Sequence, residues 1–273
     1  MKRALLRTLA RGACLAGLLV SNAPAIAEVG QWTRIGPPSG DVSRVVVAPT
    51  APQLVYALQG TEVLRSNDGG LRFRSVTRHL TGFSARSLAV SPVRARTVLI
   101  FTESLHGNSL FRTEDGGEHW QLLEVPPTFF SRLGFAPADG NVIYADDGEE
   151  IFRSNDGGES WRLRSAGLPL PTPQRALLDF DLDHRDPNVA WTVVEREGRT
   201  RAFHTLDGGS QWTERHRGLP EGVRGVAADP ALRGAAYAYT TDYVFYTRNA
   251  GRNWRQVSHG PLRPCGPRHP AEA

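Results

Sequence analysis

Five short segments of the chain place an acid or amide side chain in nearly the same setting of eight residues. These segments, which we call the boxes, are SNDGGLRF (66–73), TEDGGEHW (113–120), SNDGGESW (154–161), TLDGGSQW (205–212) and TRNAGRNW (247–254). Their third residues are Asp68, Asp115, Asp156, Asp207 and Asn249, and their eighth residues are Phe73, Trp120, Trp161, Trp212 and Trp254. A carboxylate on a turn could act as a general acid or base. It could equally accept hydrogen bonds from the backbone N–H groups of its own turn.

A second group of acids lies in the segment LLDFDLDHRDP at 177–187. Asp179, Asp181 and Asp183 alternate with apolar residues, so an extended strand would place all three carboxylates on one face. A buried carboxylate near other acids has a raised pKa and can serve as a general acid. Carboxylates in such positions also form structural ion pairs. The choice between these two roles depends on the secondary-structure elements that position the three side chains.

The spacing of the boxes indicates a repeated structural unit. Their third residues lie 47, 41, 51 and 42 positions apart, and a period of about 45 is typical of one supersecondary unit repeated along a chain. Each box has an apolar residue two positions before it and an aromatic residue at its end, which predicts a strand, a glycine turn and a second strand. Each box is therefore expected to be the turn of a β-hairpin.

Two further strands recur upstream of each hairpin. The first ends in VVVAP, LAVSP, LGFAP, FDLDH or VAADP, and the second is QLVYAL, RTVLIF, NVIYAD, NVAWTV or GAAYAY. Each unit then has four strands, a, b, c and d, and no part of the mature chain has a sustained helical period. Four-stranded units repeated radially form a β-propeller. We predict an all-β propeller of five blades, with an extra N-terminal strand QWTRI at 31–35 that either joins the rim of one blade or marks an incomplete larger ring.

The same pattern favours a structural role for the boxes. Glycines supply the positive φ of a tight turn, and the terminal aromatic residue can pack between neighbouring strands. Asn249 can accept the same hydrogen bonds as an aspartate but cannot act as a carboxylate acid or base. Ala250 replaces the first glycine of the last box, so we expect that φ need not be positive at this position. Boxes spread around the rim of one face cannot converge on one substrate.

Strand a of each blade should line the central channel. The residues that align with Asp181 in the other blades are uncharged, whereas Arg44 and Arg132 align with Asp179. We predict that Arg44, Arg132, Asp179 and Asp181 lie at the channel mouth and form a possible binding site. If the chain is a hydrolase, Asp181, together with Asp179, is the candidate acid. If the chain is not a hydrolase, these acids are expected to form ion pairs with arginines.

The structural alternative pairs the strand acids with Arg44, Arg132 or Arg175 and so orders the channel. We favour this alternative over catalysis. The histidines and cysteines show no spacing typical of a metal site, and no glycine-rich phosphate loop occurs. We therefore expect neither a metal nor another cofactor.

The N-terminus predicts export. Lys2, Arg3, Arg7 and Arg11 precede a short apolar run and an Ala-x-Ala cleavage signal, so residues 1–27 are expected to be a signal peptide, 28–258 the propeller and 259–273 a disordered tail rich in Pro and Gly. The apolar run is too short to span a bilayer, and we expect a periplasmic or extracellular protein. Of 32 basic and 28 acidic residues, four cations leave with the signal, giving 28 of each. This balance argues against nucleic acid as a partner.

The box consensus Ser/Thr-x-Asp-x-Gly-x-x-Trp resembles the Asp-box of the bacterial neuraminidase repeat. The surrounding sequence NVIYADDGEEIFRSNDGGESW (141–161) is similar to the repeats of the photosystem II assembly and stability factor family and of sortilin-like propellers. This resemblance covers about residues 30–258 and implies a β-propeller that binds proteins or assists assembly. Asp-boxes also occur in sialidases and xyloglucan hydrolases, so the alternative is a glycoside hydrolase acting on a carbohydrate.

The two hydrolase families are matched only in part. Of the Phe/Tyr-Arg-Ile-Pro segment of sialidases, TRIGPP (33–38) keeps only Arg34 and Ile35. Xyloglucan hydrolases of this kind place two propellers around a cleft, and this chain has the length of about one. We therefore expect a non-catalytic module that binds a protein partner, with the variable loops 77–85, 124–130, 166–174 and 195–201 on the binding face.

Overall fold

The structure is a computed structural model that describes residues 36–37, 40–77, 80, 82–104, 107–125 and 130–258. The chain divides into Met1–Ile35 and Gly36–Ala273, and only the second unit contains described residues. The predicted signal peptide, the extra strand at 31–35 and the tail at 259–273 thus lie outside the described residues. Among the described residues, no helix is long and apolar enough to cross a membrane.

In the part of the chain that the structure describes, twenty strands form five antiparallel sheets of four, which we number as blades 1 to 5. Blade 1 contains β1 (Val42–Val47), β2 (Val55–Gln59), β3 (Glu62–Ser66) and β4 (Arg74–Ser75), and blade 2 contains β5 (Ser84–Val90), β6 (Val98–Ser104), β7 (Gly107–Thr113) and β8 (Gln121–Leu123). Blade 3 contains β9 (Arg132–Ala136), β10 (Asp139–Asp146), β11 (Ile151–Ser154) and β12 (Arg162–Leu163). Blade 4 contains β13 (Arg175–Leu182), β14 (Ala190–Arg196), β15 (Arg199–Thr205) and β16 (Thr213–Glu214), and blade 5 contains β17 (Gly225–Ala228), β18 (Ala236–Tyr239), β19 (Val244–Thr247) and β20 (Arg255–Gln256).

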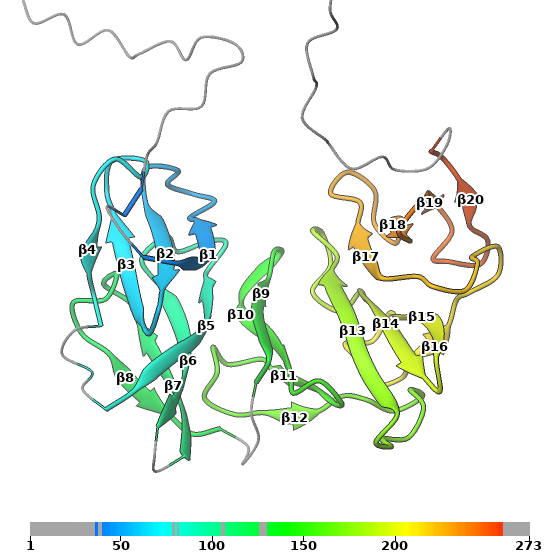
Figure 1. The fold of residues 1–273 in the computed structure, drawn as a ribbon, viewed down its shortest axis with the longest axis horizontal. Coiled ribbons are helices and arrows are strands. Elements are labelled where there is room, and N and C mark those ends of the chain that lie inside the picture. Colours follow the sequence, from blue (N-terminus) through cyan, green and yellow to red (C-terminus); the bar gives the residue numbers. More distant parts are fainter. Residues whose placement is uncertain are drawn as a thin grey trace, which may run out of the picture. The chain divides into compact units, whose positions relative to one another are not determined.

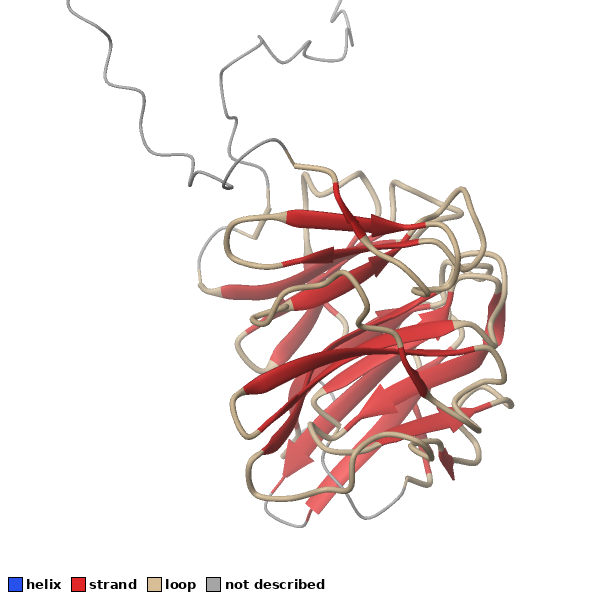
Figure 2. Cartoon of the chain, turned by 90° about the vertical axis from the view of Figure 1, so that its right-hand side faces the viewer, coloured by secondary structure: helices blue, strands red, loops and turns tan. Residues whose placement is uncertain are grey.

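This arrangement confirms the predicted all-β propeller of four-stranded blades. Within every sheet the strands lie in chain order, and each neighbouring pair is antiparallel (Figure 1). Each box lies between the third and fourth strands of its blade, as the repeat predicts. The described residues contain strands and loops but no helix (Figure 2).

The hydrophobic core consists of four clusters, and each cluster joins two consecutive blades. The second strands supply its centre, because Tyr56, Leu99, Tyr144 and Trp191 are fully buried there. Consecutive residues of these four strands are buried, because successive side chains point to opposite faces and each face packs on a neighbouring strand or blade. Among the described residues, no core cluster contains side chains from both blade 5 and blade 1.

Candidate functional site

All five boxes have the same hydrogen-bond geometry, described here for residues 154–161. The Ser154 hydroxyl donates to Asp156 Oδ1 at 2.7 Å and accepts the N–H of Gly158 at 2.8 Å. Asp156 Oδ1 also accepts the N–H of Ser160 at 2.9 Å. The equivalent bonds recur in the other four boxes. Each third side chain therefore ties together the backbone of its own turn.

These bonds lower the pKa of the box acids. Burial opposes ionisation of Asp156, but hydrogen bonds from Ser160 and Ser154 outweigh it and lower its pKa to about 2. Hydrogen bonds from the His119 backbone and the Thr113 hydroxyl hold the pKa of Asp115 well below its usual range. A general acid needs the opposite shift to be protonated near neutral pH. The box acids are thus poorly suited to donate protons.

The last box makes the same bonds without a carboxylate. The Thr247 hydroxyl donates to Asn249 Oδ1 at 2.9 Å, and this oxygen accepts the N–H of Asn253 at 3.1 Å. Our expectation that φ need not be positive at Ala250 is wrong, because its φ is +56°. The Ala250 N–H donates to the carbonyl of Gly234 at 3.1 Å, and the first glycine of each other box donates likewise to a residue just before the second strand of its blade or, in blade 3, near the start of that strand. This bond fixes the backbone whatever the side chain.

Ala250→Gly should therefore stabilise the protein. A non-glycine residue in the left-handed region costs about 1–2 kcal/mol, and the greater freedom of glycine in the unfolded chain offsets roughly half of that gain. We expect the free energy of unfolding to rise by about 0.5–1 kcal/mol, measured by chemical denaturation. The matched change Gly69→Ala places a methyl group at the same position of blade 1, where φ is +74° and no heavy atom lies within 4 Å of the added group, and it should destabilise. Equal stabilities for all three proteins would contradict the role given to the turn.

The box tryptophans join consecutive blades. Trp120 Nε1 donates to the carbonyl of Val76 at 2.8 Å, Trp212 Nε1 to Arg164 at 2.7 Å and Trp254 Nε1 to Arg215 at 2.7 Å. Each acceptor belongs to the preceding blade or to the segment that follows it. Trp161 differs, because its Nε1 donates within its own box to Gly158 at 3.1 Å. The side chain of Phe73 in the first box has no N–H group, so it cannot form this hydrogen bond.

A hollow of about 280 Å³ brings the four predicted channel residues together. Arg44, Arg132, Asp179 and Asp181 all line it, beside Phe135, Phe180 and other residues of β9 and β13. The innermost strand of a blade supplies each of the four, as the alignment of the repeats predicted. That these residues form a binding site stays a prediction, and the partners of each side chain decide what the group can do.

Arg132 is held by its surroundings in blades 3 and 4. Its Nε and Nη2 atoms donate to the two oxygens of the buried Asp146 at 2.7 and 3.1 Å. The same guanidinium donates to the carbonyls of Leu178 at 2.7 Å and Leu177 at 2.9 Å. Its Nη1 also lies 3.8 Å from Asp179 Oδ1. The hydrogen bonds of Arg132 thus connect blades 3 and 4, and few of its N–H donors remain for a ligand.

Asp179 and Asp181 of β13, and Asp183 directly after it, accept backbone N–H groups of blade 5. Asp179 Oδ2 accepts from Val226 at 3.2 Å, and Asp181 Oδ2 accepts from Ala228 at 2.8 Å. Farther along, Asp183 Oδ2 accepts from the next segment of blade 5, at Gly234, at 2.8 Å. The acids therefore satisfy N–H groups of the neighbouring blade that would otherwise be left unpaired.

The protonation of the two channel acids follows from burial. Burial raises the pKa of Asp181, and the N–H groups of Ala228 and Leu182 oppose this shift. Burial likewise raises the pKa of Asp179, opposed first by the Val226 N–H and then by the charge of Arg132. Raised pKa values favour a general acid, but the accepted N–H bonds favour the ionised form. The pKa shifts of Asp179 and Asp181 are therefore compatible both with a general acid and with a structural acceptor of hydrogen bonds.

Arg44 and Arg175 depart from the expected pairing. Arg44 is exposed and has no hydrogen-bond or ion-pair partner among the described residues, so it is a free cation in the hollow. Arg175 is buried, and none of its three nitrogens has a partner in the described part of the chain. A bulge between Leu177 and Asp179 changes the alternation of β13, so Arg175 faces away from the acids that we expected it to meet.

The sequence analysis missed a second connection between blades. The arginine just before the last residue of the third strand reaches the box of the next blade. Arg65 Nη1 donates to the carbonyl of Gly116 at 2.6 Å, and Arg112 Nη1 donates to that of Gly157 at 3.2 Å. An arginine recurs directly before three boxes, and this repetition was the available signal. In the described residues, no group of three His, Cys, Asp or Glu side chains is placed to hold a metal ion.

Comparison with known proteins identifies the fold. No family model and no curated protein sequence matches the chain. Among solved structures, the chain is similar to a GH74 enzyme of Niastella koreensis, with a TM-score of 0.62 and 20% identity over 79% of this chain and 38% of that one. It is also similar to YCF48 from Cyanidioschyzon merolae, with a TM-score of 0.58 and 12% identity over 83% and 74% of the two chains.

A third neighbour is YCF48 bound to D1 peptide, with a TM-score of 0.56 and 16% identity over 82% of this chain and 73% of that one. The chain spans well under half of the length of the GH74 enzyme. At such identities the likeness concerns the fold and not the activity. Together with the five four-stranded sheets, it shows that the chain is a β-propeller.

Proposed function

We propose that this protein is an exported, non-catalytic β-propeller of the Asp-box type that binds a protein partner or supports its assembly. The observation that carries this proposal is the engagement of Asp179, Asp181 and Asp183 by backbone N–H groups of blade 5. The candidate acids for hydrolysis thus have their carboxylates engaged in hydrogen bonds that connect blade 4 to blade 5. The box geometry supports the Asp-box assignment, and the basic and apolar N-terminus supports export.

The proposed binding face carries the turns between the second and third strands and the connections between blades. In blade 4, the Thr200 hydroxyl accepts the N–H groups of Gly222 and Val223, both at 3.0 Å, so a strand end and a connection lie together. Beside them is a hollow of about 440 Å³ lined by Leu178, Glu195, Arg224 and other residues. We propose that this hollow, which combines the apolar Leu178 and Val223 with threonines and two charged side chains, receives a polypeptide segment.

The charges of this face indicate the chemistry of the partner. Arg44 and Arg224 are both exposed, line the two hollows and lack partners among the described residues. Free arginines bind carboxylates well because the planar guanidinium offers paired donors. The likeness to YCF48 bound to D1 peptide provides a precedent for peptide binding by this fold. We therefore propose a partner segment that carries acidic groups.

Replacing both arginines by glutamate should weaken partner binding. The test is capture of partners from the native envelope by purified protein, followed by titration of the captured protein. We expect one saturable partner, and an affinity for Arg44→Glu/Arg224→Glu that is lower by at least tenfold, equivalent to about 1.4 kcal/mol. The control is Arg162→Glu, which changes an exposed arginine of the outer strand β12. Capture that is unsaturable, or equally weakened by the control, would contradict the proposal.

A glycoside hydrolase is the second candidate function. The observation in its favour is that burial raises the pKa of Asp179 and Asp181 within one hollow, and the fold is similar to that of a GH74 enzyme. In this alternative Asp181 would be the general acid and Asp179 its partner. The backbone N–H bonds to both carboxylates weigh against it, because these bonds favour the ionised form and a general acid must be protonated.

A further inference from the structure

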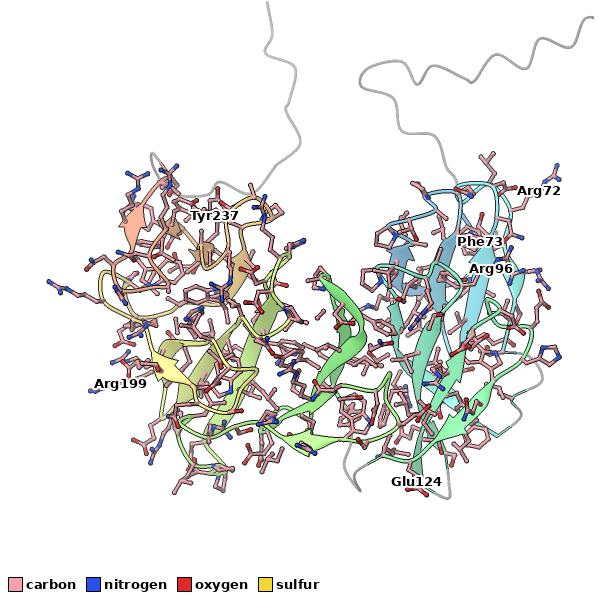
Figure 3. All side chains as sticks on the ribbon, turned by 180° about the vertical axis from the view of Figure 1, so that it is seen from behind. Arg72, Phe73, Arg96, Glu124, Arg199 and Tyr237 are labelled. Atoms are coloured by element: carbon pink, nitrogen blue, oxygen red, sulfur yellow. The ribbon has the colours of Figure 1, made fainter. Side chains whose placement is uncertain are left out.

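The two ends of the blade array expose faces that are buried at every junction inside it. At the four internal junctions, the central residue of the second strand is fully covered by the next blade, as with Tyr144 and Trp191. The equivalent residue of blade 5 is Tyr237, which is 39% exposed (Figure 3). Two residues farther along, Tyr239 is 40% exposed, whereas its counterpart Val193 is fully buried. The outward face of blade 5 thus lacks the cover that the other blades have.

The opposite face of blade 1 shows the complementary exposure. Val45 and Val47 of β1 are 58% and 49% exposed. Their counterparts in the innermost strands of the later blades include Leu88 and Val90 of blade 2, which are buried against blade 1. Contiguous exposed apolar residues of this kind mark an interaction site. Blade 5 therefore exposes the face that a following blade covers at the internal junctions. Blade 1 exposes the face that a preceding blade covers there.

Contacts at the internal junctions show how two such faces fit. The ring of Trp191 in blade 4 meets that of Trp254 in blade 5, with centroids 5.5 Å apart. The residues equivalent to this pair at the two ends are Tyr237 and Phe73 (Figure 3). The Tyr144 hydroxyl donates to the carbonyl of Pro187 in the next blade at 2.8 Å. At the ends, the matching donor is Tyr237, and the matching acceptor is the carbonyl of the exposed Pro52, which lies three residues after Pro49 as Pro187 lies three residues after His184.

A coupled change of residue type supports the same pairing. Arg65 forms an ion pair with Glu118 of the following blade, and Arg112 forms the same pair with Glu159, both at 3.0 Å. At the two ends, the position of the arginine holds Tyr246 and that of the glutamate holds Leu71. The charged pair of these internal junctions thus has no charged counterpart at the ends, where the hydroxyl of Tyr246 already donates to Asp229 at 2.8 Å. Leu71 is 65% exposed, which is unfavourable unless something covers it.

We infer that blade 5 of one molecule docks on blade 1 of a second copy of this chain, repeating the contacts of the internal junctions. The second copy is the occupant because the two faces of one molecule remain exposed in the structure and so do not cover each other. Such a contact joins two different patches, so it closes into a ring or continues as a polymer. This inference does not depend on the proposed function.

Complementation between two variants tests this inference. Leu71→Glu disables the blade 1 face and Tyr237→Arg disables the blade 5 face, and both positions are exposed enough to keep the fold. By light scattering during gel filtration, the mature wild type should associate as its concentration rises. Each variant alone should be monomeric, with a dissociation constant raised by at least about tenfold. Their mixture should form a one-to-one dimer, because one intact junction remains.

The control is Leu122→Glu, which adds the same charge at an exposed leucine of the outer strand β8 and should associate like the wild type. A wild type that is monomeric at all concentrations would overturn the inference, and so would closure of blade 5 on blade 1 of the same molecule. Association that survives either variant alone would also overturn it, since it would require a different face. Circular dichroism confirms that every variant is folded before its mass is interpreted.

Discussion

Arg132→Ala should lower the free energy of unfolding by about 3 kcal/mol, because it leaves the carboxylate of Asp146 buried and without its cation. The Asp146 side chain is fully buried, whereas about a quarter of the Arg132 side chain is exposed, so the lower end of the usual range applies. The change also removes two bonds to backbone carbonyls of β13. Chemical denaturation measures the effect.

Two further variants separate this structural role from ligand binding. Arg44→Ala removes a guanidinium from the same hollow but breaks no bond among the described residues, so it should change the free energy of unfolding by less than about 0.5 kcal/mol. Adding Asp146→Asn to Arg132→Ala removes the unpaired charge and should recover part of the loss. Similar effects of Arg44→Ala and Arg132→Ala would contradict the structural role of Arg132.

Trp212→Ala should destabilise the propeller by about 3–5 kcal/mol. The Trp212 side chain is almost fully buried between blades 3 and 4, and its Nε1 donates to the carbonyl of Arg164. Removing it leaves a cavity in the cluster that joins the two blades. The measurement is again the free energy of unfolding by chemical denaturation.

Trp161 provides the matched comparison, because it ends an identical type of box but is only partly buried and bonds within that box. Trp161→Ala should therefore cost less than Trp212→Ala. Trp212→Phe keeps most of the apolar volume and loses the hydrogen bond, so it should cost about 1–2 kcal/mol. If truncation of the two tryptophans had the same effect, packing between blades would not be the main contribution of the boxes.

The strands and boxes could be predicted from the sequence because their signals are local. A glycine turn between apolar positions specifies a hairpin within eight residues, and the repeat supplies the same signal five times. Asn249 was a correct guide to the bonds of its box. Ala250 was a misleading one, because the side-chain preference of alanine is overridden by the N–H bond to Gly234, sixteen residues earlier.

The contacts between blades could not be predicted, because they depend on how one sheet is rotated on the next. Alignment of the repeats placed Arg132 and Asp179 in one hollow. It could not show that Arg132 pairs with Asp146, fourteen residues away on the neighbouring strand. Nor could it show that the carboxylate of Asp181 meets a backbone N–H of blade 5. A bulge in β13 also moved Arg175 away from the acids, and the alternating pattern contains no sign of that bulge.

The central claim is that the acids of this propeller connect its backbone and do not catalyse hydrolysis. Its most direct test is turnover of a panel of chromogenic glycosides by the purified mature protein and by Asp181→Asn. The asparagine preserves an acceptor for the Ala228 N–H but cannot donate a proton as an acid. We predict no turnover by either protein. Turnover by the wild type that disappears in Asp181→Asn would contradict the claim and establish a glycoside hydrolase.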